Sequence, residues 1–560
     1  MRSDKMKKGE DRFLSRSLIS AGGLSEEQID KPLIGVLNSY TNFFTGHAHQ
    51  MPVERAVMDG ILMGGGTPCT AGTIALCDGI CENTPGMRYP LVSRDIIADS
   101  VEAFCECHSL DGVICIGSCD KIVPGMLMAI MRMNIPAIFI SGGMSLPPDE
   151  GYDTGENFAN MMAAGVTGTY QKKTNPCGPN PGCNCGMGTA VSMQMMSETL
   201  GIGMLGNSTI PNCYNDRTWL AQAAGKRIVE MVYEDLKPSD IISNQSFINC
   251  LRVDMMMGCS TNTTLHLPSI AAEAGYKITL DDFAWASRNT PQIVKLYPSM
   301  STHNVLDFAR AGGMRAVLNQ AIEAGYVDGS VKTLYGHTLG EMVAGAKALN
   351  TDIIHPFDNP YTEEGGLAIL YGNLSPEGCV IKTGGVLPEM LEHTGRAVVY
   401  DSEHECYEGM VRGEVKSGDC VVIRYEGPVA GPGMREMLTI THCIRAMGLD
   451  RTVSLITDGR FSGGSVGGVI GHVSPEACKG GIIGLIETGD IIEYSIPKAT
   501  IELKVSDEVL AKRRAKWVCP PPRVRTGLLA QYAALALPAP QGARMCGDPS
   551  TLDELKPIRG

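Results

Sequence analysis

Acidic residues and thiols recur in this chain at glycine-rich turns, where a backbone can approach a ligand closely. The stretch GSCDKIVPG places Cys119, Asp120 and Lys121 side by side after an apolar run. Thiolates are ligands for iron–sulfur clusters, and carboxylates are ligands for hard cations such as Mg²⁺. A salt bridge between Asp120 and Lys121 is the simpler alternative. The stretch predicts either an ion pair or a site that holds a soft and a hard group together.

Four other glycine-rich turns carry an acidic residue, a thiol or a serine. They are CDGI with Cys77 and Asp78, GCNCGM with Cys183 and Cys185, and the pair GPGMREM and TDGRFSGGS with Glu436 and Ser462. Each signal alone is weak, because buried thiols often give a C-x-C pair and Asp before glycine is usually a turn residue. Their combination at predicted strand ends indicates a functional site.

The first half of the chain must position these turns. Short β-branched runs at 32–39, 111–118 and 135–143 alternate with helical patterns at 95–110 and 125–134. This rhythm predicts an α/β domain with a largely parallel sheet. Functional residues gather at the carboxyl ends of strands in such sheets. The GSCDKIVPG stretch follows a predicted strand directly, which favours a site over a surface ion pair.

The second half of the chain has a different sequence pattern. After a mostly helical pattern over 190–350, residues 351–366 are rich in turn formers and mark a candidate boundary. Beyond it, short alternating strands separated by glycine turns predict a β-rich, barrel-like domain. We expect an α/β domain over 1–355, carrying the thiols and most of the acidic ligands. A barrel-like domain over 366–560 would carry Glu436 and Ser462.

Composition limits the partners and the compartment. The 560 residues are 44% hydrophobic and 19% charged, with a net charge of −14, which argues against nucleic acid or an anionic membrane as a partner. The start lacks the apolar region of a secretory signal, and no stretch approaches the roughly 18 to 20 apolar residues of a membrane helix. Twenty dispersed cysteines suit a reducing compartment. We expect a cytoplasmic protein without a membrane partner.

Several long segments resemble a known family. CDKIVPGMLMA, GGLAILYGNLSPEG, GPGMREMLT and LITDGRFSGGSVGGVIGHVSPEA are similar to the signature segments of the dihydroxy-acid dehydratase and phosphogluconate dehydratase family. The resemblance extends from GVLNSYTNF to VSDEVLAKRRAKW. It implies a hydro-lyase that converts a 2,3-dihydroxy acid into a 2-keto acid through an enol. It also implies an iron–sulfur cluster paired with Mg²⁺.

The resemblance assigns roles by position. It implies Mg²⁺ ligands at Asp78, Asp120, Lys121 and Glu436, a cluster ligand at Cys119 and the catalytic base at Ser462. Lys121 would bind through a carbamate, whose formation needs a neutral amine, so we expect a depressed pKa for Lys121. An unperturbed serine is too weak a base for a C2 proton. Ser462 must therefore ionise under the influence of nearby cations.

One departure from the family pattern concerns the cluster type. Gly46 stands where the branch with a two-iron cluster has a cysteine, and the GHAH segment is similar to relatives of which several carry four irons. The sequence therefore favours [4Fe–4S] over [2Fe–2S]. Cys77 could then supply a ligand, or it could be a buried thiol. His47 and His49 could contact the site or be structural.

Other departures concern the third thiol and the substrate pocket. GCNCGM is shorter than the usual family segment, so either Cys183 or Cys185 could be the ligand, and we favour Cys185. CENTPGM replaces the usual A-M-G-H-x-G-M, and Val466 stands where an arginine is common. These changes leave the expected reaction type intact but put the substrate in question.

Three hypotheses follow for the function. The first is dehydration of 2,3-dihydroxy-3-methylbutanoate to 3-methyl-2-oxobutanoate, and of its ethyl homologue, in valine and isoleucine biosynthesis. The second is dehydration of a sugar acid by the same metals and Ser462, supported by the altered pocket. The third is a non-catalytic iron–sulfur protein, which would need neither the magnesium ligands nor a base. In each enzymatic case the partner is a small hydroxy acid, and the family resemblance implies a homodimer or homotetramer.

Overall fold

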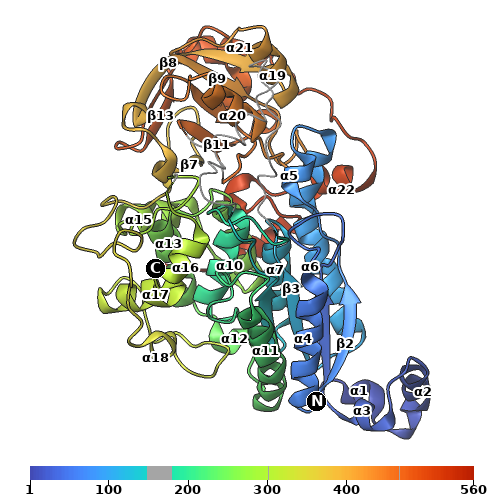
Figure 1. Cartoon of the computed structure of the whole chain (residues 1–560). Coiled ribbons are helices and arrows are strands. Elements are labelled where there is room, and N and C mark those ends of the chain that lie inside the picture. Colours follow the sequence, from blue (N-terminus) through green and yellow to red (C-terminus); the bar gives the residue numbers. More distant parts are fainter. Residues whose placement is uncertain (148–179, 301, 464, 466, 560) are drawn as a thin grey trace.

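The computed structural model describes residues 1–147, 180–300, 302–463, 465 and 467–559. These residues form one large sheet in each half of the chain and a small two-stranded sheet, with helices packed around them. In Figure 1 the second sheet, coloured orange, lies above the helices and the blue sheet of the first half. In the part of the chain that the structure describes, no helix is long and apolar enough to span a bilayer.

A parallel four-stranded sheet lies at the centre of the first half, in the order β2-β1-β3-β4. Every residue of β1, β3 and β4 is buried, as expected for strands covered on both faces. The three strands and the parallel sheet predicted from the apolar runs are confirmed. The strands are β1 (Leu33–Asn38), β2 (Thr67–Gly72), β3 (Gly112–Gly117) and β4 (Ala137–Ser141).

The apolar runs do not predict the edge strand β2. Its sequence, TPCTAG, has no β-branched run, and most of its residues are partly exposed. Pro68 lacks the N–H that a ladder needs, which a strand tolerates at the edge of a sheet. Pairing with the buried β1, and not propensity, therefore makes this segment a strand.

Two pairs of helices pack around the first sheet. The helices α4 (Gln50–Met63) and α11 (Asn215–Glu234) lie side by side, and so do α6 (Tyr89–Cys107) and α7 (Ile122–Met133). Glycine allows the first pair to approach backbone to backbone. A Cβ at Gly60 would collide with the carbonyl oxygen of Gln222.

The helical character predicted for residues 190–350 is confirmed. Together with the helices at the start of the chain, these elements complete the first half. They are α1 (Asp4–Lys7), α2 (Phe13–Ala21), α3 (Glu26–Asp30), α10 (Thr189–Thr199), α12 (Pro238–Ile241), α13 (Asn244–Met257), α14 (Thr263–Glu273), α15 (Leu280–Arg288), α16 (Val305–Arg310), α17 (Gly313–Glu323) and α18 (Leu339–Val343).

An eight-stranded mixed sheet forms the second half, in the order β13-β12-β8-β9-β10-β11-β7-β6. The strands β8, β9, β10 and β11 run parallel to one another. The pairs on either side of them are antiparallel. The strands are β6 (Ala368–Leu370), β7 (Gly378–Ile381), β8 (Glu392–Tyr400), β9 (Asp419–Ile423), β10 (Ser454–Thr457), β11 (Val469–Ser474), β12 (Ile491–Ser495) and β13 (Thr500–Leu503).

The outer edges of this sheet meet, which nearly closes it into a barrel. Tyr371, directly after β6, donates its backbone N–H to the carbonyl of Ala499 at 3.0 Å and accepts from the N–H of Ile501 at 2.9 Å. Pairing the two edges satisfies backbone groups that an open sheet would leave exposed. The barrel-like second domain is therefore confirmed.

The two faces of this sheet carry separate apolar clusters. Along β9, Cys420 and Val422 belong to the cluster inside the barrel, whereas Val421 and Ile423 pack against the outer helices. This alternation follows from the two-residue period of a strand. The helices of this half are α19 (Glu403–Val411), α20 (Thr439–Ala446), α21 (Asp507–Lys516) and α22 (Gly527–Leu535).

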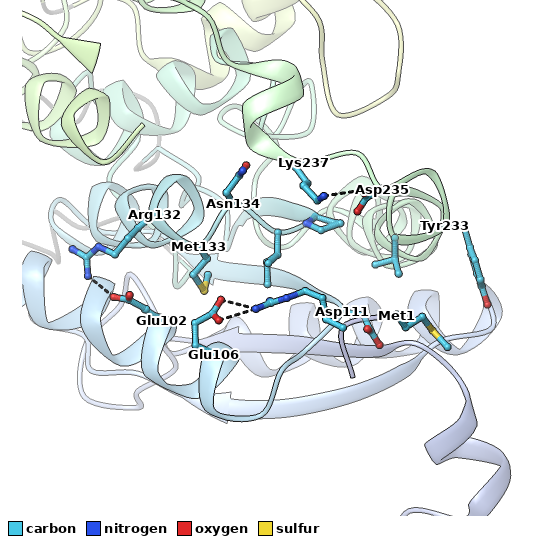
Figure 2. Close-up of a pocket in the computed structure, with 14 residues that line it drawn as sticks. Met1, Glu102, Glu106, Asp111, Arg132, Met133, Asn134, Tyr233, Asp235 and Lys237 are labelled. Atoms are coloured by element: carbon cyan, nitrogen blue, oxygen red, sulfur yellow. Dashed lines mark hydrogen bonds and ion pairs between the residues drawn. The ribbon is translucent and has the colours of Figure 1, made fainter. Parts of the chain in front are cut away.

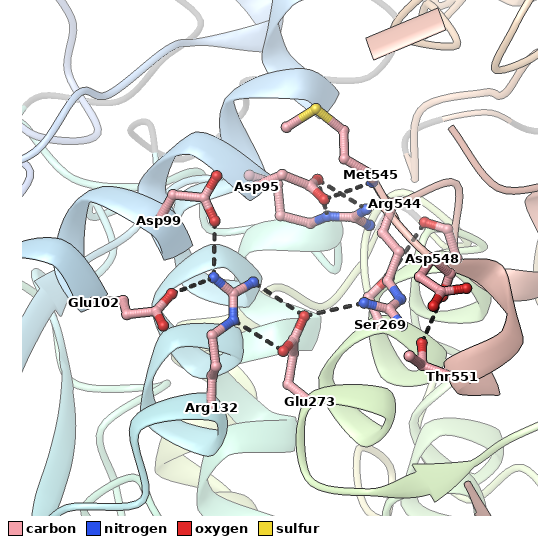
Figure 3. Close-up of polar contacts among 12 residues, drawn as sticks. Asp95, Asp99, Glu102, Arg132, Ser269, Glu273, Arg544, Met545, Asp548 and Thr551 are labelled. Atoms are coloured by element: carbon pink, nitrogen blue, oxygen red, sulfur yellow. Dashed lines mark hydrogen bonds and ion pairs between the residues drawn. The ribbon is translucent and has the colours of Figure 1, made fainter. Parts of the chain in front are cut away.

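The end of the chain returns to the first half. There β14 (Lys556–Pro557) pairs with β5 (Tyr276–Lys277). Arg544 forms an ion pair with Glu273 at 3.1 Å, and Glu273 also pairs with Arg132 at 2.9 Å (Figure 3). The C-terminal segment thus fastens the second half of the chain onto the helices of the first.

We predict that Gly60→Ala lowers the melting temperature by several degrees. Alanine normally stabilises a helix interior relative to glycine by about 1 kcal/mol. Here the added Cβ would push α4 away from α11, and overpacking of this kind typically costs about 1–3 kcal/mol. Differential scanning calorimetry would measure the shift. Gly72→Ala, where the nearest atom would be 3.8 Å away, is the control, and equal melting temperatures would contradict the prediction.

Candidate active site

The carboxyl ends of β2 and β3 present the acidic and thiol residues. After β2 the chain reaches Cys77, which caps the short helix α5 (Asp78–Cys81). After β3, Cys119 and Asp120 lie in the turn before α7, and Lys121 is the N-cap residue of that helix. Since both strands are parallel to β1, which lies between them, their ends meet at one edge of the sheet.

Three carboxylates and one lysine meet at this edge. Asp78, Asp120 and Glu436 each offer an oxygen, and these oxygens lie within 4.8 Å of one another. The Nζ atom of Lys121 lies 3.0 Å from Asp78, 3.3 Å from Asp120 and 3.4 Å from Glu436. The structure therefore brings together all four residues expected to bind Mg²⁺, with Glu436 supplied by the second half of the chain.

A buried arginine completes this cluster. Arg460 is fully buried and forms ion pairs with Glu436 and, at 3.5 Å, with Asp78. Residues 436 and 460 also pair through their backbones, with Met437 donating its N–H to the carbonyl of Arg460 at 3.0 Å. Arg460 was not among the residues predicted from the sequence, although it lies in the TDGRFSGGS segment that was singled out.

The donor set of this cluster fits a hard cation. All three acidic ligands are oxygen donors, as Mg²⁺ prefers. Both carboxylate oxygens of Asp78 are buried, and neither has a hydrogen-bond partner, although Lys121 lies within ion-pair distance. A buried carboxylate without a directed hydrogen bond is costly, and coordination of a metal ion would satisfy it.

The electrostatics of Lys121 differ from expectation. Burial and the nearby Arg460 lower the pKa of Lys121, but the carboxylates of Asp78, Asp120 and Glu436 together raise this pKa above its ordinary value. The predicted depression of the pKa is therefore wrong for this arrangement. Burial also raises the pKa of Asp78, against the lowering effect of Lys121.

Two of the predicted cluster ligands lie side by side. The thiols of Cys77 and Cys119 hydrogen-bond to each other. This bond lowers the pKa of Cys77 and, together with burial, raises the pKa of Cys119 well above its usual range. The pair lies directly beside Asp78 and Asp120 in the sequence, so thiols and carboxylates are adjacent, and Lys121 also forms the ion pair with Asp120 that GSCDKIVPG allows.

His47 holds the backbone behind Cys119. Its Nε2 accepts the N–H of Cys119 at 3.2 Å, and its Nδ1 lies 2.8 Å from the carbonyl of Ser39. Burial lowers the pKa of His47 to about 4, so the ring is neutral and both nitrogens are used. His49 contacts the carbonyl of Gly142 at 2.5 Å. His47 therefore orients the turn that contains Cys119 through its backbone.

The two candidates for the third thiol have different surroundings. Gln194 donates to the thiol of Cys183 at 3.5 Å and to the carbonyl of Ser118 at 2.9 Å, which links Cys183 to the residue before Cys119. Cys185 is fixed through its carbonyl, which accepts the N–H of Val305 at 2.8 Å. Burial raises the pKa of both thiols to about 11.

The serine turn comes from the loop after β10. Ser462 accepts the N–H of Ser465 through its carbonyl at 3.0 Å, which closes a β-turn. A Cβ at Gly463 would lie 3.1 Å from Gly188 and 3.0 Å from Ser260, so the turn rests against the first half of the chain. Val466 lies outside the described residues.

Hydrogen bonds connect this region to the carboxylates. Ser260 shares a 2.9 Å hydrogen bond with the hydroxyl of Thr189, which accepts from Asn262 at 2.8 Å. Asn262 also donates to Glu436 at 3.1 Å. Thr189 and Asn262 thus link Ser260, which lies against the turn that carries Ser462, to the carboxylate of Glu436 through buried hydrogen bonds.

The altered CENTPGM segment joins the two halves of the chain beside the cluster. Glu82 accepts the backbone N–H groups of Leu438 at 2.5 Å and Thr439 at 3.2 Å, at the start of α20. Arg435 donates to the carbonyl of Thr84 at 3.2 Å. Both contacts lie within three residues of Glu436 in the sequence, so this segment fixes the loop that delivers the third carboxylate.

A separate cavity of about 810 Å³ lies at the opposite edge of the first sheet, beside the amino ends of β3 and β4 (Figure 2). Its charged side chains pair with one another, Arg2 with Glu106 and Lys237 with Asp235, each at 2.7 Å. None of the predicted site residues lines it. The predicted residues Asp78, Asp120 and Lys121 lie instead at the carboxyl edge of the sheet.

Known proteins match this chain over nearly its full length. Residues 31–342 match the family model described as Dihydroxy-acid/6-phosphogluconate dehydratase N-terminal, and residues 352–543 match the corresponding C-terminal model. A dihydroxy-acid dehydratase of Moorella thermoacetica is 46% identical over 551 residues, which cover 97% of this chain and 100% of that protein. Proteins of the same name from Ruminiclostridium cellulolyticum and Syntrophobacter fumaroxidans are also 46% identical, over 97% of this chain and 100% and 99% of their own lengths.

Two family models that together span most of the chain, and relatives of this similarity over nearly its full length, identify an enzyme. The hypothesis of a non-catalytic iron–sulfur protein is therefore set aside. The chain belongs to the dihydroxy-acid/6-phosphogluconate dehydratase family and is a hydro-lyase.

Proposed function

We propose that the chain dehydrates 2,3-dihydroxy-3-methylbutanoate to 3-methyl-2-oxobutanoate, and its ethyl homologue likewise, in valine and isoleucine biosynthesis. The observation that carries this proposal is the buried cluster of Asp78, Asp120, Lys121 and Glu436 beside the thiols of Cys77 and Cys119. The similarity to proteins named dihydroxy-acid dehydratase supports the choice of substrate. We further propose that the enzyme works in the cytoplasm as a homodimer or homotetramer.

The carboxylates of Asp78, Asp120 and Glu436 would hold Mg²⁺. Lys121 would contribute after carbamylation, which converts its ammonium into an oxygen donor. The bound ion would supply positive charge beside the carboxylate and C2 hydroxyl of the substrate. Arg460, which pairs with Glu436 and Asp78, would fix both carboxylates and reduce the repulsion between them.

Cys77, Cys119 and Cys183 would hold an iron–sulfur cluster, which we propose to be [4Fe–4S]. We place Cys183 ahead of Cys185, because Gln194 links the Cys183 thiol to the Ser118 carbonyl. Three thiolates leave one iron of a four-iron cluster without a protein ligand, and that iron would act as a Lewis acid toward the C3 hydroxyl.

Ser462 would act as the base. As an alkoxide, its Oγ takes the proton from C2, and the electron pair of the C–H bond forms the C2–C3 double bond. The C3–O bond would break as that double bond forms, and the departing hydroxide would take the proton from Ser462 and leave as water. The resulting enol would tautomerise to the keto acid. The bond between the Ser465 N–H and the Ser462 carbonyl would hold the backbone that carries this hydroxyl.

We predict that anaerobically purified, iron-loaded enzyme with Mg²⁺ converts 2,3-dihydroxy-3-methylbutanoate into the keto acid, and that Ser462→Ala lowers kcat at least about 1,000-fold because the base is lost. Keto-acid formation would be followed with the branched substrate and with a panel of sugar acids. Ser465→Ala, in the same turn, controls for local disturbance. Turnover of a sugar acid alone would contradict the proposed substrate.

We predict that Asp78→Asn raises the Mg²⁺ concentration for half-maximal activity at least about tenfold, because a neutral amide is a weaker ligand than a carboxylate. Isothermal titration of Mg²⁺ into iron-loaded protein and metal analysis would measure the loss. Asp95→Asn, a buried acid paired with Arg94 outside the site, is the matched control. Equal affinity in Asp78→Asn and wild type would remove Asp78 from the metal site.

We predict that Cys183→Ser loses most of its iron and acid-labile sulfide, whereas Cys185→Ser retains both, because the Cys183 thiol shares Gln194 with the Ser118 carbonyl. Iron and sulfide analysis with visible absorption would measure the cluster without any assay of activity. Cys379→Ser, a buried thiol in the barrel, should retain a full cluster. The reverse order of loss would assign the ligand to Cys185.

A further inference from the structure

Lys382 is a buried lysine beside the turn that carries Ser462. It follows β7 directly, and only 7% of its surface is exposed. Its Nζ donates to the carbonyl of Gly463 at 3.1 Å and to the carbonyl of Met187 at 3.3 Å. Gly463 is the residue after Ser462, and Met187 follows the cysteine segment by two residues. One ammonium group therefore joins the serine turn to the first half of the chain.

A backbone hydrogen bond close to Lys382 also holds the loop that contains Ser462. Gly467 donates its N–H to the carbonyl of Gly385 at 3.0 Å, three residues beyond Lys382. On its other side, Gly463 rests against Gly188 and Ser260. The serine turn is thus enclosed between the segment that begins at Lys382 and the loops of the first half, and the lysine is the charged member of this contact.

Lys382 also shares a small cavity with Ser462. Thr261 and Phe461 belong to the same lining, and among the described lining residues Lys382 alone is charged. A positive charge in a buried cavity acts at high strength, because little water screens it. Such a charge would stabilise an alkoxide on the serine more than it stabilises the neutral hydroxyl.

Several titratable groups surround Lys382. Burial lowers its pKa to about 8, while Cys259 and Asp254 raise it and Lys295 lowers it further. Asp254 is itself buried and accepts a hydrogen bond from Thr263 at 2.8 Å. The lysine therefore keeps a proton at neutral pH and faces one carboxyl group that already has a partner.

We propose that Lys382 is a positioning residue for Ser462, whose ammonium fixes the serine turn and favours the alkoxide form of the base. This inference rests on the proposed role of Ser462 as the base. It adds a residue that acts through the serine and does not touch the reacting carbon.

The test compares Lys382→Met, which keeps the length of the side chain but removes its charge, with Lys382→Arg, which keeps the charge. Lys382→Met should lower kcat at least about 100-fold with KM changed less than about threefold, as for loss of one preorganised donor. The acidic limb of the pH–rate profile, which reports ionisation of the base, should shift to higher pH. Lys382→Arg should recover at least a tenth of the lost activity. Lys295→Met, a half-buried lysine nearby, is the matched control and should behave as wild type.

Hydrogen exchange, followed by mass spectrometry without substrate, provides a second readout. The peptide that contains residues 459–469 should exchange faster in Lys382→Met, with the rest of the chain and the iron content unchanged. If the wild-type enzyme did not turn over the substrate, the proposed function would be contradicted. The exchange result would still test the contact between Lys382 and the serine turn. If Lys382→Met exchanged hydrogen and turned over substrate at the same rates as the wild-type enzyme, the inference would be overturned. Faster exchange across both halves would also overturn it, because the lysine would then be a general structural contact.

Discussion

The burial of Lys121 among three carboxylates is the constraint on which the rest of the structure depends. Its side chain is fully buried, and Asp78, Asp120 and Glu436 surround it at 3.0 to 3.4 Å. Leaving such an ammonium without these carboxylates would cost at least about 3–5 kcal/mol, because neither water nor a counterion would then stabilise it. Two strand ends and a loop of the barrel must therefore meet at one point, which fixes how the two halves pack.

The interface between the halves is accordingly polar beside this cluster. Glu82 and Arg435 hold the loop around Glu436, and Lys382 holds the turn of Ser462. The C-terminal segment adds the contact of Arg544 with Glu273 on the far side of the same helices. Each half folds around its own apolar cluster, but neither contains a complete site.

Sequence patterns predict the elements and turns that depend on residues close together in the sequence. The buried strands β1, β3 and β4 appear as apolar runs, and the acidic and thiol residues appear as turns at strand ends. Arg460, Asn262 and Lys382 could not be predicted, because each matters through a partner more than 20 residues away in the sequence. The raised pKa of Lys121 has the same origin, since spacing cannot show how many carboxylates surround an amine.

The position of Lys121 also links its chemistry to that of the metal site. Its ammonium lies at the centre of the three carboxylates, so a divalent cation bound by the same oxygens would stand only a few ångströms from a positive charge. At that separation in a buried site, like charges repel strongly. Loss of the ammonium charge by carbamylation would remove this repulsion and add an oxygen donor. Because the same carboxylates raise the pKa of Lys121, the neutral amine that carbamylation needs would form once a bound cation offsets their charge.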